Sequence, residues 1–203
     1  MELLCLGDSL TFGYGVRASQ RWTSLAAAES GWKITNLGLS GDTTGGMLAR
    51  LQSRILSTGA PGSCPGERPV VMLMGGCNDI FYSGTDQGAR ANMGAMAQQL
   101  LAAGITPLIG IPMNIGSRGF PEQWGTLVDF PAAGKLLSSY CDWLTAYAAA
   151  FRLPTVDFRP DFLLPGGPDD SLYLDGLHPN TEGHRRMARR LADTLIKIER
   201  NLV

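Results

Sequence analysis

The fold is decided by the stretch Leu3-Leu4-Cys5-Leu6-Gly7-Asp8-Ser9-Leu10. Its first four residues are all apolar, which is typical of a short strand that is buried on both faces of a sheet. Such a strand would deliver Ser9 to its carboxyl end, the edge at which open parallel sheets bind their ligands. These residues alone leave two interpretations open, because Asp8 and Ser9 can form a reactive site or can simply cap a turn.

The remaining chain alternates short apolar runs with longer helical patterns. The expected strands are Leu3–Leu6, Lys33–Leu37, Pro69–Met74, Ile105–Ile111 and Thr155–Phe158, and the expected helices are residues 19–30, 43–56, 85–103, 132–152 and 181–199. Strands that alternate with helices predict right-handed crossovers and a parallel sheet covered on both faces. We therefore expect an α/β fold, a three-layer α/β/α arrangement with a flavodoxin-like five-stranded parallel sheet.

Length and composition are those of one globular domain, which we expect to span residues 1–203. Only 17% of the residues are charged and the formal net charge is −1, so the chain has no basic field that would attract nucleic acid. Arginines crowd one segment near the C-terminus, where they are expected to form the solvated face of a helix. A membrane surface or an acidic partner is the alternative reading of this segment, which contains Arg185, Arg186, Arg189 and Arg190.

No apolar run approaches the roughly 20 residues that span a bilayer. No signal-peptide pattern precedes the first strand, so the expected location is the cytoplasm, or the periplasm or exterior if a signal peptide has been removed. The spacings of the four cysteines match no metal-binding signature, and buried free thiols are expected. The sequence carries no signal of an oligomeric state.

Small polar groups follow most of the expected strands. Besides residues 7–10, they are Gly38–Thr43, Gly76–Asp79 and Asp175–Asn180. Because the carboxyl ends of parallel strands lie at one edge of a sheet, these turns are expected to meet around Ser9.

Serine-based acyl transfer requires a base, and histidine is the usual one near neutral pH. Of the two histidines, His184 lies within the arginine-rich helix, where a solvated or packing role is favoured. His178 lies in a turn three residues after Asp175, whose carboxylate can orient the imidazole. The alternative is that Asp175, His178 and Asn180 only shape the entry of the last helix.

The tetrahedral intermediate of such a reaction needs hydrogen-bond donors for its oxyanion. Gly41 offers a backbone N–H at the mouth of a helix, Asn78 offers a side-chain amide, and Ser9 offers its own N–H. Each has an ordinary structural alternative, because Gly41 can serve a tight turn and Asn78 can begin a helix. Their joint appearance in this order favours catalysis.

The chain resembles the SGNH hydrolases of the GDSL esterase/lipase superfamily. The matching residues are Ser9 in Gly7–Leu10, Gly41 in Ser40–Thr43, Asn78 in Gly76–Asp79, and His178 with Asp175. The resemblance extends from residue 3 to about residue 195. It implies a flavodoxin-like fold, the catalytic residues Ser9, Asp175 and His178, and an oxyanion hole made by Ser9, Gly41 and Asn78. It also implies that no metal or organic cofactor is required.

Within that superfamily, the chain is most similar to the small bacterial acyl-CoA thioesterase I, lysophospholipase and arylesterase group. The segment Ile111–Arg118 carries this part of the resemblance. Two long loops, Pro112–Pro131 and Arg159–Gly176, hold apolar residues that would either form an acyl-binding groove or pin the loops to the body. The candidates for substrate binding are Met113, Ile115, Phe120, Trp124 and Phe162.

The expected function is hydrolysis of carboxylic esters or thioesters through an acyl-enzyme on Ser9. Lipid-like, aryl or short-acyl compounds are the expected small-molecule substrates. One alternative is a carbohydrate O-acetyl esterase, which uses the same chemistry on polar substrates. Another is a non-enzymatic binding module on a flavodoxin-like scaffold, which should lack a catalytic partner or carry a phosphate-binding loop; neither is seen.

Overall fold

The computed structural model describes residues 1–57 and 70–202, and its central feature is a parallel five-stranded sheet. The strands lie in the order β2-β1-β3-β4-β5, with β1 at Glu2–Gly7, β2 at Lys33–Gly38, β3 at Val70–Met74, β4 at Thr106–Ile111 and β5 at Thr155–Asp157. The order reverses after β2, so β1 and β3 are neighbours at the centre of the sheet. The predicted fold class is confirmed. The expected start of the third strand at Pro69 lies outside the described residues.

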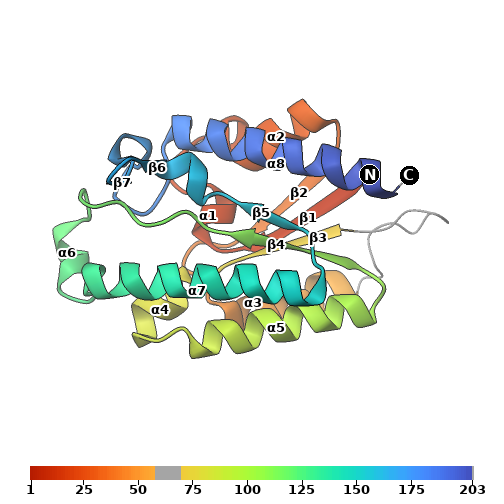
Figure 1. The fold of residues 1–203 in the computed structure, drawn as a ribbon, viewed down its shortest axis with the longest axis horizontal. Helices are drawn as coiled ribbons and strands as arrows, with labels where there is room; N and C mark the ends of the chain where they lie inside the picture. Colours follow the sequence, from red (N-terminus) through yellow and green to blue (C-terminus); the bar gives the residue numbers. More distant parts are fainter. Residues whose placement is uncertain (58–69, 203) are drawn as a thin grey trace.

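Helices cover both faces of this sheet (Figure 1). One face carries α2 (Trp22–Ser30) and α8 (Thr181–Leu202), which pack against each other. The other face carries α3 (Thr44–Leu51), α4 (Cys77–Ser83), α5 (Gln87–Ala102) and α7 (Phe130–Phe151). Two short helices, α1 (Ser9–Phe12) and α6 (Glu122–Gly125), lie toward the carboxyl ends of the strands.

The hydrophobic core lies around the two central strands. Leu3, Cys5 and Leu6 of β1 are fully buried, and every residue of β3 is buried. Each such aliphatic side chain contributes roughly 1.5–3 kcal/mol when it leaves water. The residues after Glu2 are apolar because β1 lies in the middle of the sheet with helices on both faces. The same position places Ser9 at the carboxyl edge of the sheet.

Several local features differ from the sequence-based expectation. Helices α1 and α4 were not expected as separate elements, because their 4 and 7 residues are too few for a clear helical period. Helix α7 begins at Phe130 rather than at residue 132, because the Asp129 side chain accepts a hydrogen bond from the Ala132 N–H at 3.0 Å. The expected helix 43–56 divides into α3 and a π-helical turn, Gln52–Leu56. A short hairpin, β6 (Leu163–Leu164) and β7 (Gly167–Pro168), lies in the last long loop.

The arginine-rich face of α8 is only partly solvated. Arg190 forms two hydrogen bonds of 2.7 Å with the carboxylate of Asp161, and Arg186 donates to the Asp161 carbonyl at 2.9 Å. These contacts tie α8 to the 3₁₀ turn Arg159–Phe162. Arg185 pairs with Glu182 of its own helix at 3.1 Å, and Arg189 is exposed. The cluster therefore stabilises the tertiary structure as well as facing water.

Within the described residues, none of the helices has the length and apolar character needed to cross a membrane. Cys5, Cys77 and Cys141 are buried and free, as expected for apolar thiols. Cys64 lies outside the described residues.

Candidate active site

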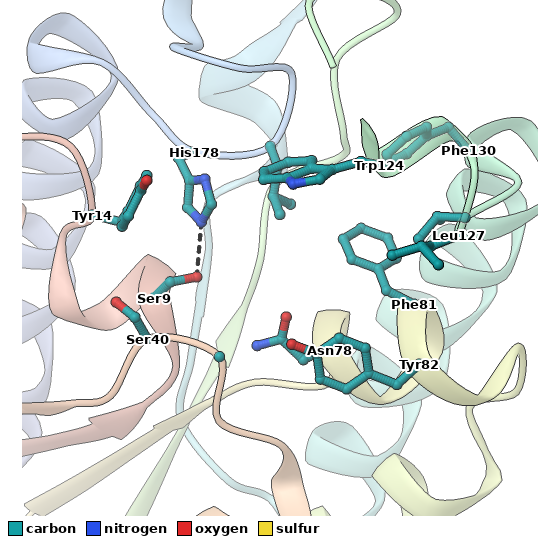
Figure 2. A pocket seen from close by; sticks show the side chains of 13 residues that line it. Ser9, Tyr14, Ser40, Asn78, Phe81, Tyr82, Trp124, Leu127, Phe130 and His178 are labelled. Carbon is teal, nitrogen blue, oxygen red and sulfur yellow. Dashed lines mark hydrogen bonds between the residues drawn. The ribbon is translucent and has the colours of Figure 1, made fainter. Parts of the chain in front are cut away.

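Ser9 is held at the carboxyl end of β1 by the start of a short helix. Asp8 caps α1, because its Oδ1 accepts a hydrogen bond of 2.9 Å from the Leu10 N–H. A side chain at Gly7 would place its Cβ 2.5 Å from the Met74 carbonyl oxygen, so only glycine allows this close approach of β1 and β3. Ser9 is 7% exposed, and its Oγ faces a cavity (Figure 2).

A continuous hydrogen-bonded chain joins Ser9 to His178 and Asp175. His178 Nε2 lies 2.9 Å from Ser9 Oγ, and His178 Nδ1 lies 2.8 Å from Asp175 Oδ2. Asp175 Oδ1 also accepts the backbone N–H groups of His178 at 2.8 Å and Leu177 at 3.1 Å. With the ring proton on Nδ1, the imidazole donates to the carboxylate and accepts the serine hydroxyl proton at Nε2. The three side chains are therefore arranged for proton transfer from the serine.

Asp175 is held in its ionised form. Burial acts to raise the pKa of this carboxyl group, but the hydrogen bonds and the charge of His178 outweigh burial and lower the pKa below its ordinary value. An ionised carboxylate stabilises the imidazolium that forms when His178 takes a proton. The two residues thus form a coupled acid-base pair.

Two aromatic rings flank the imidazole of His178. The Tyr14 ring lies with its centroid 4.5 Å away at an interplanar angle of 41°, and the Trp124 ring lies 6.1 Å away at 73°. Figure 2 shows these rings on opposite sides of His178. The two rings therefore lie on either side of the imidazole.

Gly41 and Asn78 lie across the same cavity. Gly41 has a φ of 78° in the turn before α3, and Asn78 lies at the start of α4. The Asn78 side chain donates one hydrogen bond to the Asp42 carbonyl at 2.8 Å. An amide nitrogen carries two hydrogens, so the second N–H is left for a ligand. Both residues line the cavity with Ser9, as an oxyanion hole requires.

The turn that carries Gly41 is held in place by polar contacts with Arg50 and Asp79. Arg50 binds Asp42 Oδ2 through two nitrogens at 2.6 and 2.8 Å. It also donates to the carbonyl oxygens of Gly7 at 2.8 Å and Leu37 at 2.6 Å, at the ends of β1 and β2. No local sequence pattern marks Arg50, because its partners come from three separate segments of the chain.

Asp79 provides the second brace. Its carboxylate accepts the Thr44 N–H at 2.9 Å and the Thr44 Oγ1 hydroxyl at 2.6 Å. The residue next to Asn78 therefore caps α3, the helix that follows Gly41. Asp8 and Asp79 therefore support the starts of two helices beside the site.

Asp8 has an unusual environment for a carboxyl group. It is 1% exposed, and its Oδ2 has no hydrogen-bond partner among residues 1–57 and 70–202. Burial raises the pKa of Asp8 to about 7, despite the bond from Leu10 N–H. A substantial neutral fraction at neutral pH limits the negative charge beneath the site.

A mostly apolar cavity with a volume of about 520 Å³ opens beside Ser9. Its polar side contains the residues described above, and its apolar side comes from α4 and from the segment around α6 (Figure 2). The apolar lining residues are Phe81, Tyr82, Trp124, Leu127, Val128, Phe130 and Leu177, with Tyr14 beside His178. The cavity can hold an apolar group next to the serine hydroxyl.

The structure separates the five residues expected to bind substrate. Trp124 lines the catalytic cavity, whereas Ile115 and Phe120 line a second cavity beside it. Met113 is 2% exposed and Phe162 is fully buried, so neither reaches the cavity and that expectation is corrected for both. Apolar residues in a long loop can join the core, and these two do.

Phe81 and Tyr82 were missed by the sequence analysis although a signal existed. They follow Asn78 by three and four positions, and residues at these spacings share one face of a helix. Recognising α4 as a helix would have placed both rings beside Asn78.

His184 lies apart from the site and is fully buried between α8 and α2. Its Nδ1 accepts the Trp22 N–H at 3.3 Å. Burial, with smaller contributions from the charges of Arg21 and His178, lowers its pKa to about 4. The packing role anticipated for His184 agrees with this position.

A hydrogen-bonded serine, histidine and aspartate at the carboxyl edge of a parallel sheet define the class of serine hydrolases. The comparison with family models agrees, because the GDSL-like Lipase/Acylhydrolase family model matches residues 5–186. The chain belongs to this family and is an ester hydrolase.

Two curated relatives match almost the whole chain. Esterase TesA of Pseudomonas aeruginosa is 28% identical, with 95% of this chain and 87% of that protein aligned. The Escherichia coli protein named thioesterase 1/protease 1/lysophospholipase L1 is 30% identical, with 95% of this chain and 82% of that protein aligned.

Solved structures share the fold. A crystal structure of TesA superposes with a TM-score of 0.69 at 25% identity and covers 100% of both chains. The aryl esterase of M. smegmatis superposes with a TM-score of 0.78 at 21% identity, covering 100% of this chain and 99% of that one.

Proposed function

We propose that this chain hydrolyses carboxylic esters or thioesters through an acyl-enzyme on Ser9. The observation that carries the proposal is the chain of 2.9 Å and 2.8 Å contacts from Ser9 Oγ through His178 to Asp175. A serine hydroxyl needs a neighbouring base to become a nucleophile, and this arrangement supplies one. We further propose that residues 1–203 form a single hydrolase domain, since the matched family model extends over residues 5–186.

In the first half of the reaction, Ser9 Oγ attacks the acyl carbonyl carbon while its proton passes to His178 Nε2. Asp175 holds the ring and stabilises the imidazolium. The backbone N–H groups of Ser9 and Gly41 and the free amide hydrogen of Asn78 bind the oxyanion. His178 then gives its proton to the leaving alcohol or thiol as the carbonyl bond re-forms.

In the second half, water replaces the leaving group. His178 takes a proton from this water as its oxygen attacks the acyl carbon of the ester on Ser9. The same oxyanion donors act again. The proton returns to Ser9 Oγ as the acyl–serine bond breaks, and the carboxylic acid leaves.

The apolar wall of the cavity supports an acyl or aryl group of low polarity as the part of the substrate bound beside Ser9. Phe81, Trp124, Leu127 and Phe130 contribute no charged group there. Pockets of this kind bind through apolar contact with a few polar anchors. The relatives named esterase and thioesterase 1/lysophospholipase support esters and thioesters of lipid-like or aryl compounds as the substrate class.

The two other functions considered have weaker support. A carbohydrate acetylesterase from Sinorhizobium meliloti has the same fold at 22% identity, a likeness that speaks to fold alone. An apolar wall offers few hydrogen-bond partners to a sugar. A non-enzymatic binding module would not need Ser9, His178 and Asp175 in contact.

Active-site labelling tests the proposal directly. An organophosphonate should add its mass to Ser9, and Ser9→Ala should lose both the label and ester turnover. Ser40→Ala is the matched control, because Ser40 also lines the cavity and is exposed but has no histidine partner among the described contacts. Normal turnover by Ser9→Ala, or a label on another residue, would overturn the proposal. A panel that crosses acyl length with oxygen and sulfur leaving groups then defines the substrate.

A further inference from the structure

A second cavity of about 260 Å³ lies next to the catalytic cavity. Phe130 lines both cavities, whereas Phe120 lines only the second. The second cavity is also lined by Ile115 and Gly134, which lie close together, and by Ser117 and the exposed Lys135. One aromatic side chain therefore separates the space beside Ser9 from a further space.

Phe130 belongs to a group of three rings. The Phe120 ring is stacked on it with a centroid distance of 3.7 Å and an interplanar angle of 12°. On the side of the catalytic cavity, Phe81 meets Phe130 edge to face at 6.0 Å and 78°. Such contacts fix ring orientation as well as burying surface. The pair Phe120–Phe130 thus forms a continuous partition, which we call the aromatic wall.

The aromatic wall is anchored on both sides. A Cβ at Gly176 would lie 2.8 Å from the Phe120 ring, so this ring packs directly on the backbone of the turn that carries Asp175 and His178. The Gly116 N–H donates to the Gly176 carbonyl at 2.7 Å, which ties the loop before Phe120 to the same turn. The wall therefore keeps a fixed position relative to the catalytic residues.

Phe130 is fixed by the start of a helix. It is the first residue of α7, whose N-terminus is capped by Asp129 and carries Pro131. Figure 2 shows Phe130 at the end of the cavity away from Ser9, beyond Trp124. An acyl chain that extends from Ser9 along the apolar side would run toward this ring.

We propose that the aromatic wall sets the maximum length of the acyl chain. The inference rests on the proposed function, because it assumes that an acyl group on Ser9 occupies the apolar side of the cavity. Straight acyl chains that end before Phe130 bind fully. Longer chains must leave an apolar end in water or displace two stacked rings, so their transition states are less stabilised. The second cavity is the space that longer chains would enter if the wall were opened.

The test compares kcat/KM for p-nitrophenyl esters from acetate to palmitate. The wild type should lose efficiency beyond a certain length, and Phe130→Ala should move that limit to longer chains. The ratio of kcat/KM for the longest to the shortest ester should rise by about 10-fold or more. Each additional methylene group that binds in an apolar pocket changes kcat/KM by about 10-fold or more. Phe120→Ala should produce a smaller rise, because Phe130 then remains in place.

Two further variants keep the test decisive. Phe151→Ala removes an exposed ring from the other end of α7 and should leave the length profile unchanged. Phe130→Leu retains apolar bulk, should fold if the alanine variant does not, and should still raise the ratio. Profiles for Phe130→Ala or Phe130→Leu that run parallel to the wild type would overturn the proposal.

The experiments distinguish failure of the proposal about the aromatic wall from failure of the proposed function. A wild-type protein that turns over esters and is labelled at Ser9, with unchanged length profiles in the variants, contradicts only the wall. A wild-type protein with neither turnover nor label contradicts the proposed function itself.

Discussion

The chain has only two histidines, His178 in the turn before α8 and His184 inside α8, and their surroundings are opposite. Both nitrogens of His178 have a side-chain partner, Asp175 on one side and Ser9 on the other. His184 has one backbone partner, and its Nε2 has none within residues 1–57 and 70–202. Burial lowers the pKa of His184 and keeps its ring neutral, whereas His178 lies between the Asp175 carboxylate and the Ser9 hydroxyl group.

The tertiary position of each histidine thus decides whether its side chain can take part in catalysis or only in packing. The hydrogen bond to Ser9 crosses 169 positions of the sequence and exists only because β1 and the turn before α8 end at one edge of the sheet. The bond from Trp22 to His184 crosses 162 positions but joins two helices of the core. The following predictions test this division, from the largest expected effect to the smallest.

The first prediction exchanges each histidine for glutamine. His178→Gln should lower kcat/KM for a p-nitrophenyl ester by about 10⁴- to 10⁶-fold, because it removes the base while leaving the fold in place. His184→Gln should change kcat/KM by less than about 3-fold at neutral pH, because it touches neither Ser9 nor the cavity. Steady-state kinetics with a thermal melt of each variant checks both. Equal losses of activity in the two variants would contradict the assignment of His178 as the base and His184 as a packing residue.

The second prediction concerns stability against pH. The pKa of His184 is lowered to about 4 in the folded chain, and the ordinary value in the unfolded chain is about 6.5. The unfolded state therefore binds more protons between these values, so stability is full above about pH 6.5 and falls as the pH drops toward 4. Between pH 7 and pH 5 this residue alone should remove about 2 kcal/mol from the free energy of unfolding.

Urea unfolding of the wild type and of His184→Gln at both pH values measures this term. The variant should be less stable at pH 7, because it disturbs a packed site, but its loss on going to pH 5 should be smaller by about 2 kcal/mol. The same pH dependence in both proteins would show that His184 is not the buried neutral group.

The third prediction concerns the ring beside His178. Tyr14 lies 4.5 Å from the imidazole, and an aromatic face stabilises a neighbouring cation by roughly 0.5–1 kcal/mol at an exposed position. Tyr14→Leu should therefore lower kcat by roughly two- to five-fold, since 1.36 kcal/mol corresponds to ten-fold. Tyr14→Phe keeps the ring and should retain nearly full kcat. Loss of activity in Tyr14→Phe would instead assign a role to the hydroxyl group.

Much of the fold was predictable from the sequence because it depends on local periodicity. A continuous run of apolar residues such as Leu3–Leu6 fits a strand only where both faces of the sheet are covered. The alternation of such strands with helices then predicts parallel crossover connections. The polar turns at the strand ends follow from the same rule. For this reason Ser9, Gly41, Asn78 and His178 could be named before any coordinates, and the structure brings them to one cavity.

Other features depend on contacts between distant segments and have no local signature. Arg50 joins two strand ends to the Gly41 turn, and nothing around it in the sequence indicates that task. The apolar residues of the long loops looked alike, yet Phe162 entered the core while Trp124 lined the cavity. The hydrophobicity of a side chain predicts that it will be buried, but it does not predict which residues will pack against it.

The sequence by itself determined the layered α/β fold, the four polar turns and the residue types needed for acyl transfer. These features could be predicted because strands and helices follow from local periodicity. The meeting of the polar turns follows from topology, since the carboxyl ends of parallel strands lie at one edge of the sheet. The tertiary structure alone decided which rings form the cavity, that Arg50 joins two strand ends to the Gly41 turn, and that Phe120 and Phe130 stack at the end of the cavity. These outcomes depend on side-chain packing across the whole chain, where small differences in position select the partner of each group.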